Sequence, residues 1–394
     1  MSDVTVLAAT GNQMVAEAFR QASVDVLAAY PITPQTTIVE NFAKYVADGR
    51  VHTEFVAVES EHSAMSASVG ASAAGARVAT ATASQGLALM FEELYIASGM
   101  RLPIVMANAN RALSAPINIH GDHSDVMGCR DCGWIFLFAE TAQVAYDNTL
   151  ISYRIAEHPE VLLPVMSTLD GFITSHAMER CELMDDATVT SYVGERIPVN
   201  PLINGPVAVG HGMFSSLGGP YFKLKKAQRA AVENSIPFIK EAGDAWAQIS
   251  GRSFDFVDAW GCEDADYIIV IAGSASGNTR VVAKELRAQG IKAGVARIRL
   301  YRPFPVKEIV ETLKGAKAIA ILDRSDSFGA QYGPMCLDVR SALYEEGLLI
   351  PMRNYIYGLG GADVTLDALR QAFTEVQQLA AGELDQGLSY LGVR

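Results

Sequence analysis

The sequence predicts an α/β protein with two domains, each built on a mainly parallel sheet. Short apolar segments rich in Val, Ile and Ala alternate with helical segments along most of the chain. The chain has 394 residues, of which 50% are hydrophobic, and this is too long for one compact core. The alternation is interrupted once, from about residue 195 to residue 246, by a segment rich in glycine and proline. These three observations favour two α/β domains joined by an irregular connector.

The expected elements of the first domain follow the alternation of apolar strands and helices. In chain order they are a helix at 11–22, a strand at 24–30, a helix at 36–49, a strand at 54–60, a helix at 61–75, a strand at 77–84, a helix at 87–99 and strands at 102–110 and 161–167. The strand at 24–30 ends at a Tyr-Pro-Ile-Thr-Pro sequence, and the helix after it closes at Gly49. We place the first domain at residues 1–235, with the connector beginning at about 195.

The connector is expected to have little core of its own, because its Gly/Pro-rich part is followed by a basic helical stretch. The alternation then resumes with strands at 267–273, 292–300, 317–323 and 352–358 and helices at 278–290 and 306–315. We place the second domain at residues 260–394.

Composition and charge exclude several classes of protein. The net charge of −13 argues against nucleic-acid binding, which needs clustered Lys and Arg. No apolar run is long enough to span a bilayer, and the N-terminus lacks the pattern of a secretory signal. The odd count of five cysteines fits a reducing compartment better than a disulfide framework. We therefore expect a cytoplasmic protein.

Residues 30–34, YPITP, are the first candidate for a ligand site. Ligands of open parallel sheets bind beyond the carboxyl ends of the strands, and this sequence follows such an end. Pro31 and Pro34 restrict the backbone on both sides of Thr33, so a threonine held there suits a ligand contact. The alternative is a tight turn in which Thr33 caps the next helix, and both remain open on this pattern alone.

Two further strand ends carry polar or small residues. Glu59 and Glu61 lie where a strand becomes a helix, so each fits a helix cap or a carboxylate in a site. The helix that follows is nearly all Ala, Ser and Gly, which is typical of close approach by a cofactor or another subunit. Residues 84–86, Ser-Gln-Gly, follow the next strand, where a single glycine is weak support for a cofactor loop.

The densest polar stretch begins at Arg111, which follows an apolar strand and suits a bidentate grip on a carboxylate. Six residues after it invite a metal site, namely His120, Asp122, His123, Asp125, Cys129 and Cys132. We favour loop contacts and helix caps instead, because the CxxC pair has no partner and the histidine spacing is not that of a helical ligand pair. Residues 273–279, GSASGNT, lack a phosphate-binding fingerprint and are better explained as an ordinary strand-to-helix turn.

Five segments in this order resemble one known family. They are YPITPQT, VESEHSAMSA, TATASQGLALM, RLPIVMANANRALSAPINIHGDHSD and LDGFITSH. Together they closely resemble the α subunit of 2-oxoacid:ferredoxin oxidoreductases, with the pyruvate branch most similar, and the resemblance covers nearly the whole chain. It implies a pyrimidine-binding thiamine diphosphate domain in the first half and a transketolase C-terminal-like domain from about residue 260.

The resemblance also implies an activity and a set of site residues. The enzyme would oxidatively decarboxylate a 2-oxoacid, pyruvate first, to acyl-CoA and CO₂, and pass the electrons through iron–sulfur clusters to ferredoxin. Glu61 would hydrogen-bond the cofactor aminopyrimidine as the catalytic carboxylate, with Glu59 as its rival, while Thr33 and Arg111 would bind the substrate. The remaining cofactor contacts implied are Pro31, Ile32, Ser84, Gln85 and Gly86.

Two features of the family are missing from this chain. It has no GDG motif followed some 25–30 residues later by Asn, so the resemblance assigns the Mg²⁺ and diphosphate half of the site to a β subunit. It has no ferredoxin-type cysteine runs, so the [4Fe-4S] clusters are expected on ferredoxin-like γ and δ subunits. We expect CoA as co-substrate and no metal ligands on this chain.

Three alternatives stay open. The same chemistry could act on a branched or aromatic 2-oxoacid, such as 2-oxoisovalerate, phenylglyoxylate or indolepyruvate. From other classes, the chain could be a nucleotide-binding α/β protein without redox chemistry, or a structural subunit with a degenerate thiamine site. The absence of a phosphate fingerprint disfavours the former, and the presence of Thr33, Glu61 and Arg111 disfavours the latter.

Overall fold

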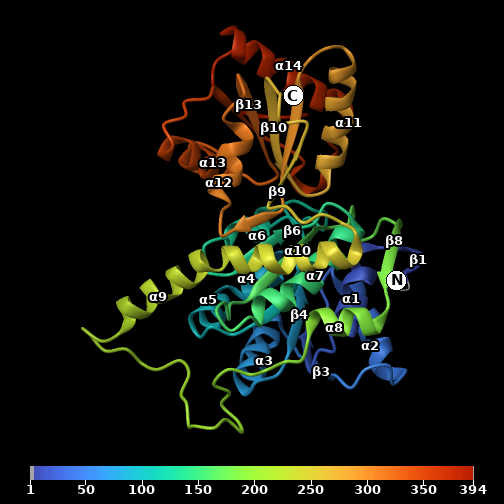
Figure 1. Ribbon diagram of the computed structural model, residues 1–394, viewed down its shortest axis with the longest axis vertical. Helices are drawn as coiled ribbons and strands as arrows, with labels where there is room; N and C mark the ends of the chain where they lie inside the picture. Colours follow the sequence, from blue (N-terminus) through green and yellow to red (C-terminus); the bar gives the residue numbers. More distant parts are fainter. Residues whose placement is uncertain (1–3, 394) are drawn as a thin grey trace.

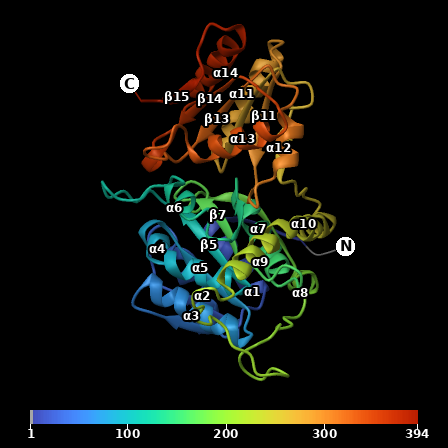
Figure 2. The ribbon, with the colours of Figure 1, turned by 90° about the vertical axis from the view of Figure 1, so that its left-hand side faces the viewer.

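The structure is a computed structural model that describes residues 4–393. Its chain forms two stacked α/β units, drawn in blue to green and in orange to red in Figures 1 and 2. The first unit is built on a sheet with the strand order β12-β6-β7-β5-β4-β2-β3. These strands are β2 (Val26–Ala29), β3 (Glu54–Ala57), β4 (Val78–Thr82), β5 (Ile104–Asn110), β6 (Ile135–Phe138), β7 (Val165–Asp170) and β12 (Leu300–Arg302). Neighbouring strands are parallel except β12 and β6, so the predicted α/β class is confirmed.

Helices cover both faces of this first sheet. They are α1 (Gly11–Gln21), α2 (Thr36–Ala47), α3 (Glu61–Ala74), α4 (Ser84–Leu89), α5 (Phe91–Gly99), α6 (Ser124–Gly128), α7 (Ala142–Ala156) and α8 (Asp186–Val193). Helix α1 begins with a capping box, in which Thr10 and Gln13 satisfy each other's backbone amides. Strands β1 (Val4–Ala9) and β8 (Glu179–Met184) form a separate antiparallel pair in the first unit.

The second unit is a six-stranded sheet with the order β15-β14-β13-β10-β11-β9, in which only the edge strand β9 is antiparallel to its neighbour. Its strands are β9 (Val257–Trp260), β10 (Tyr267–Ala272), β11 (Ala293–Ile298), β13 (Ala318–Asp323), β14 (Met352–Ile356) and β15 (Gly387–Tyr390). Its helices are α11 (Ala275–Ala288), α12 (Val306–Leu313), α13 (Pro334–Glu345), α14 (Leu366–Ala381) and the 3₁₀ turn η1 (Leu359–Gly361). Between β11 and α12 the chain crosses to the first unit as β12 and lies antiparallel to β6.

The connector differs from the expectation in its second part. Residues 195–220 form an extended loop, and α9 (Tyr221–Asn234) projects beyond the helices of the first unit (Figure 1). The next helix, α10 (Ile236–Ser250), is instead part of the first core, because Ile239 and Trp246 are fully buried there. The Trp246 indole also donates a hydrogen bond to Asp147 of α7 at 2.8 Å.

Several element boundaries also differ from the predicted ones. The helix expected at 87–99 is two helices that meet at Met90, and Ser84 to Gly86 already lie in the first of them. The strand expected at 161–167 is β7, which starts four residues later and ends at Asp170. The elements that were not predicted are strands β1, β6, β8, β9, β12 and β15 and helices α6, α7, α8, α13 and α14. No helix within residues 4–393 is long and apolar enough to cross a membrane.

Candidate functional site

One edge of the first sheet gathers the residues expected to form a site. Strands β7, β5, β4, β2 and β3 lie side by side and parallel, so their carboxyl ends meet at this edge. In the same strand order, Asp170 ends β7, and Arg111, Ser84, Thr33 and Glu61 follow the ends of the other four strands. The fold therefore places all of these residues at one edge of the sheet.

Glu61 is a buried carboxylate at the start of α3, and its side chain faces the first turn of α4. The residue is 6% exposed, and none of residues 4–393 donates a hydrogen bond to its carboxylate. Gly86 lies against it, because a Cβ atom on Gly86 would be 2.7 Å from Glu61 Oε1 and 2.5 Å from Thr82 Oγ1. The absence of a side chain at position 86 therefore lets α4 pack directly on Glu61, an acceptor that the described part of the chain does not use.

Glu59, the rival carboxylate, lies in a different environment. It is exposed and accepts a hydrogen bond from the Ser63 hydroxyl, one turn into α3. That hydrogen bond holds the pKa of Glu59 below its usual range. Glu59 is therefore an ionised surface group with its own internal donor, whereas Glu61 is sheltered and has none.

The clip at residues 30–35 is fixed at both ends. The Asn12 amide donates to the Pro34 carbonyl at 2.7 Å, and the Gln35 amide donates to the Tyr30 carbonyl at 2.8 Å. The N-cap of α2 is Gln35, so Thr33 does not cap this helix. Thr33 is exposed at the edge of the sheet, and the hydrogen bonds at Tyr30 and Pro34 fix the backbone on both sides of it.

Arg111 reaches the clip from β5. Its Nη1 donates to the Thr33 carbonyl at 3.0 Å and its Nε donates to the Asn118 carbonyl at 2.8 Å. The residue is 7% exposed, and its Nη2 forms no hydrogen bond to any residue in the described range. The structure thus brings Thr33 and Arg111 together and leaves Nη2 of the guanidinium without an acceptor among the described residues.

Asp125 organises this edge, and sequence reasoning did not identify that role. Its carboxylate accepts hydrogen bonds from five N–H groups at 2.7–3.1 Å, which belong to the backbones of Ser84, Arg111 and Val126 and the side chains of Asn108 and Asn110. Burial raises the pKa of Asp125, and the amide donors oppose that rise. The carboxylate joins the first turn of α4 to the end of β5.

The other members of the polar stretch do not converge on a metal site. His123 Nε2 lies 2.7 Å from Asp170 Oδ1, and Asp122 accepts from the backbone and the hydroxyl of Ser124. Cys129 and Cys132 are buried in the apolar core, and all five cysteines are free. Loop contacts thus explain the stretch.

The turn at residues 273–279 holds an internal carboxylate. The Ser274 amide donates to Asp170 Oδ2 at 2.8 Å, and a Cβ on Gly273 would lie 2.8 Å from the same oxygen. Arg324 Nη1 donates to this oxygen as well, also at 2.8 Å. The turn therefore belongs to the contact between the two units.

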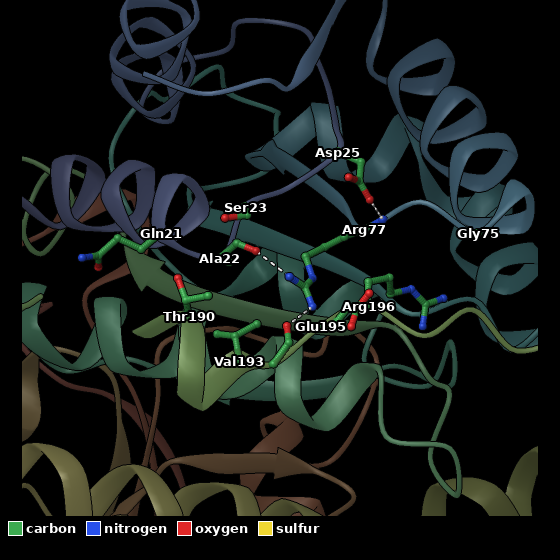
Figure 3. Close-up of a pocket in the computed structure, with 11 residues that line it drawn as sticks. Gln21, Ala22, Ser23, Asp25, Gly75, Arg77, Thr190, Val193, Glu195 and Arg196 are labelled. Atoms are coloured by element: carbon green, nitrogen blue, oxygen red, sulfur yellow. Dashed lines mark hydrogen bonds between the residues drawn. The ribbon is translucent and has the colours of Figure 1, made fainter. Parts of the chain in front are cut away.

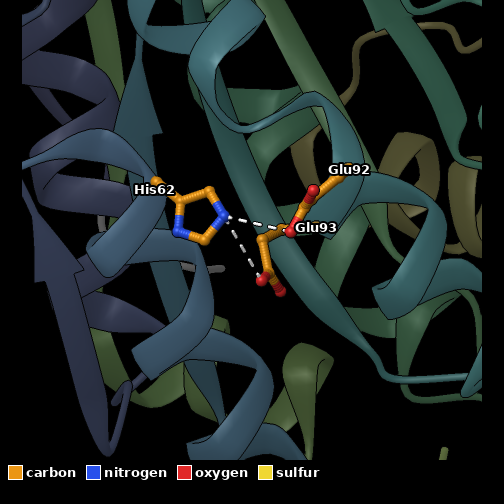
Figure 4. A group of neighbouring side chains, drawn as sticks. All are labelled: His62, Glu92 and Glu93. Carbon is orange, nitrogen blue, oxygen red and sulfur yellow. Dashed lines mark hydrogen bonds and ion pairs between the residues drawn. The ribbon is translucent and has the colours of Figure 1, made fainter.

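A mixed cluster of charged side chains joins α3 to α5. His62 Nε2 lies 3.4 Å from Glu92 and 3.7 Å from Glu93, and the Ser66 hydroxyl also donates to Glu93 (Figure 4). Histidine and two carboxylates are a possible set of metal ligands, but this set also pairs internally when the imidazole is protonated. The cluster is best described as a polar contact between the two helices.

A cavity of about 470 Å³ lies at the opposite edge of the first sheet, near the starts of β2 and β4 (Figure 3). Arg77 crosses it and is already occupied by the Glu157 carboxylate, at 2.8 Å to each oxygen, and by the carbonyls of Ala22 and Gly194. Asp25 in turn accepts from the Arg77 amide at 2.7 Å. The charged groups that line the cavity therefore pair with one another. The cavity also lies away from the carboxyl ends of the strands, where the candidate site residues gather.

Two family models match the chain. Residues 17–214 match the family described as pyruvate flavodoxin/ferredoxin oxidoreductase, thiamine diphosphate-binding. Residues 265–369 match the pyruvate:ferredoxin oxidoreductase core domain II.

Three relatives align along nearly their whole length. The pyruvate synthase subunit PorA of Thermotoga maritima is 48% identical over 98% of each chain, and that of Methanocaldococcus jannaschii is 43% identical over 96% of each. The ketoisovalerate oxidoreductase subunit VorA of Pyrococcus horikoshii is 39% identical over 97% of this chain and 96% of the relative.

Two solved structures share the fold. A 2-oxoglutarate:ferredoxin oxidoreductase from Magnetococcus marinus superimposes with a TM-score of 0.71 at 19% identity. The match covers 96% of this chain and 66% of that one, so the present chain spans slightly less than two thirds of its length. A split-gene transketolase matches with a TM-score of 0.54 at 14% identity, over 95% of this chain and 96% of the other.

Proposed function

Because the chain belongs to the pyruvate:ferredoxin oxidoreductase family, we propose that it is the α subunit of an enzyme that oxidatively decarboxylates pyruvate. The products are acetyl-CoA and CO₂, and the electrons pass to ferredoxin or a similar acceptor. Thiamine diphosphate supplies the carbon nucleophile and the electron sink for this reaction. The residues of this chain bind and orient the cofactor ring and the substrate.

The single observation that carries the proposal is the environment of Glu61. The Glu61 carboxylate is largely buried and has no internal donor within residues 4–393, so it is open to a donor from a bound group. Gly86 packs directly on this carboxylate, and any side chain there would displace it. The carboxylate suits the protonated N1′ of the cofactor aminopyrimidine, and Glu61 would hold the proton there. Ser84, Gln85, Pro31 and Ile32 would line the same ring.

Arg111 and Thr33 would bind the 2-oxoacid. The unused Nη2 of Arg111 can donate to the substrate carboxylate, and hydrogen bonds between charged groups are the strong ones. The exposed Thr33 hydroxyl would lie beside it, because the Thr33 carbonyl already accepts from the same guanidinium. The substrate would thus be oriented between the ends of β2 and β5.

The proposal requires partner subunits. The sequence lacks the motif that binds Mg²⁺ and diphosphate and lacks ferredoxin-type cysteine runs. A β subunit would supply the diphosphate half of the thiamine site, and ferredoxin-like γ and δ subunits would carry the [4Fe-4S] clusters, in a cytoplasmic complex. The chain is 48% identical to a pyruvate synthase subunit and 39% identical to a ketoisovalerate oxidoreductase subunit. A branched 2-oxoacid is therefore the second candidate substrate.

The test is reduction of an acceptor dye by the complex purified through this chain, anaerobically, with CoA and a panel of 2-oxoacids. A strong preference for pyruvate is expected. A preference for 2-oxoisovalerate or phenylglyoxylate would keep the reaction and change the substrate. No reduction with any of them, in a complex that contains the β subunit and thiamine diphosphate, would refute the proposal.

A further inference from the structure

The segment between β5 and α6, residues 112–123, is held by a turn of the second unit. Asp122 Oδ2 accepts from the Gly360 amide at 3.0 Å, and the Asn118 side-chain amide donates to the Gly360 carbonyl at 2.9 Å. Nearby, the His123 amide donates to the Arg324 carbonyl at 2.8 Å. The residue at the centre of η1 is therefore bonded through both its amide and its carbonyl by one segment of the first unit.

The shape of this turn matches the segment closely. Gly360 and Gly361 have φ angles of 58° and 78°, in the left-handed region that glycine adopts without strain. A Cβ on Gly360 would lie 2.4 Å from Asn118 Nδ2, and one on Gly361 would lie 2.3 Å from His120 Cβ. Any larger residue at either position must push the segment away from the second unit.

Asn118 transmits this contact to Arg111. Its side chain is fixed by Gly360, and its Oδ1 accepts from the His120 amide at 2.7 Å. Its own carbonyl accepts from Arg111 Nε at 2.8 Å. The guanidinium is thus held between two carbonyls, that of Thr33 in the clip and that of Asn118, which the second unit fixes.

We propose that Asn118 is a positioning residue through which the second unit sets the orientation of Arg111 and thereby the affinity for the 2-oxoacid. This inference rests on the proposed function, in which Arg111 binds the substrate carboxylate. Because Nε and Nη1 already donate to carbonyls, a rotation of the guanidinium would turn the free Nη2 away from the substrate carboxylate. Misplacement by about 1 Å can cost on the order of 100-fold in reactivity.

The test uses the assembled complex with Asn118→Asp. This change keeps the acceptor for the His120 amide and removes the donor to the Gly360 carbonyl. The KM for the 2-oxoacid should rise roughly 10- to 100-fold, while the KM for CoA and the affinity for thiamine diphosphate stay unchanged. Asp363→Asn, an exposed position after the same turn, is the matched control and should behave as wild type.

Gly360→Ala acts on the same contact from the other side and should raise the same KM. If the complex with Asn118→Asp fails to assemble, the KM of Gly360→Ala tests the inference instead. A merely structural role would lower the active fraction, so a fall in kcat at unchanged KM in either variant would overturn the inference.

A double-mutant cycle with Arg111→Lys identifies the route of the effect. If Asn118 acts through Arg111, the double variant should have the KM of Arg111→Lys alone, whereas independent effects would multiply. Multiplying effects would overturn the inference and leave the proposed function intact. An unchanged KM for Arg111→Lys itself would instead refute the assignment of Arg111, and with it both proposals for this residue.

Discussion

The Asp170 carboxylate accepts a hydrogen bond from the Arg324 guanidinium at 2.8 Å, and both side chains are almost fully buried. Asp170 ends β7 of the first sheet and Arg324 follows β13 of the second, so this ion pair joins the two units. Burial alone would raise the pKa of Asp170, but the charges of His123 and Arg324 outweigh it and hold the pKa well below its usual range.

Asp170→Asn should strongly destabilise the protein. The change leaves the buried Arg324 charge without its partner, which typically costs about 3–5 kcal/mol. A carboxylate with a depressed pKa contributes stability that is complete above its unfolded pKa of about 4 and is lost as the pH falls further. We therefore expect a lower urea midpoint at pH 7 and a weaker loss of stability below pH 4 than in wild type.

Asp367→Asn is the control for this prediction. Asp367 pairs with Arg370 on the surface, where ion pairs contribute little, so its urea midpoint should match wild type. Equal midpoints for Asp170→Asn and wild type would show that the pair does not stabilise the contact between the units.

Glu61→Gln should abolish most of the turnover while the complex stays assembled. A neutral amide cannot hold the proton at N1′, and the expected loss is on the order of 10²–10⁴-fold, as for other positioned acid–base groups. Dye reduction with saturating pyruvate measures it. Glu59→Gln is the paired variant, because Glu59 is exposed and already accepts from Ser63, and it should keep wild-type turnover. The reverse ranking would move the role to Glu59.

Gly86→Ala should weaken thiamine diphosphate binding. The added methyl group would lie 2.7 Å from Glu61 Oε1, so the carboxylate has to move away from the position in which it would hold the cofactor. Overpacking of this kind typically costs about 1–3 kcal/mol. A fluorescence titration of the apo complex with thiamine diphosphate measures the effect. Gly128→Ala adds a methyl group that meets nothing within 4 Å and should titrate as wild type.

Arg111→Lys should raise the KM for the 2-oxoacid by about tenfold or more, because an ammonium group cannot reproduce the planar fork. The hydrogen bonds to the carbonyls of Thr33 and Asn118 also use the shape of the guanidinium. Steady-state kinetics with varied pyruvate and saturating CoA provide the measurement. An equal KM for pyruvate in the wild type and in Arg111→Lys would show that the substrate carboxylate binds elsewhere.

The fold class was predictable because the buried strands are largely apolar segments that alternate with helical segments and end in polar or small residues. That pattern placed Thr33, Glu61, Ser84 and Arg111 at strand ends, and a parallel sheet must bring such ends together. Their roles came from the resemblance to a family and remain predictions. The division at residues 235 and 260 also remains a prediction, and β12 lies in the first sheet although it falls within 260–394.

Long-range contacts explain what the sequence did not reveal. The Asp125 carboxylate accepts hydrogen bonds from residues between positions 84 and 126, and a local sequence pattern does not predict that these residues meet. Helix α10 looked like part of a solvated connector, yet Gly243 lets Phe254 pack so closely that a Cβ would lie 1.9 Å from its ring. The environments of Glu59 and Glu61 likewise differ through Ser63, whose hydroxyl donates to Glu59, and the sequence pattern does not reveal this difference.

The extended loop before α9 and the first turn of α9 have a practical consequence for handling the protein. Phe214 is 90% exposed, Leu217 is fully exposed and Phe222 is 83% exposed, in a stretch that also carries Met213 and Tyr221. Exposed apolar side chains at this density promote self-association. Production of this chain by itself should therefore yield aggregates, whereas co-expression with its partner subunits should reduce aggregation.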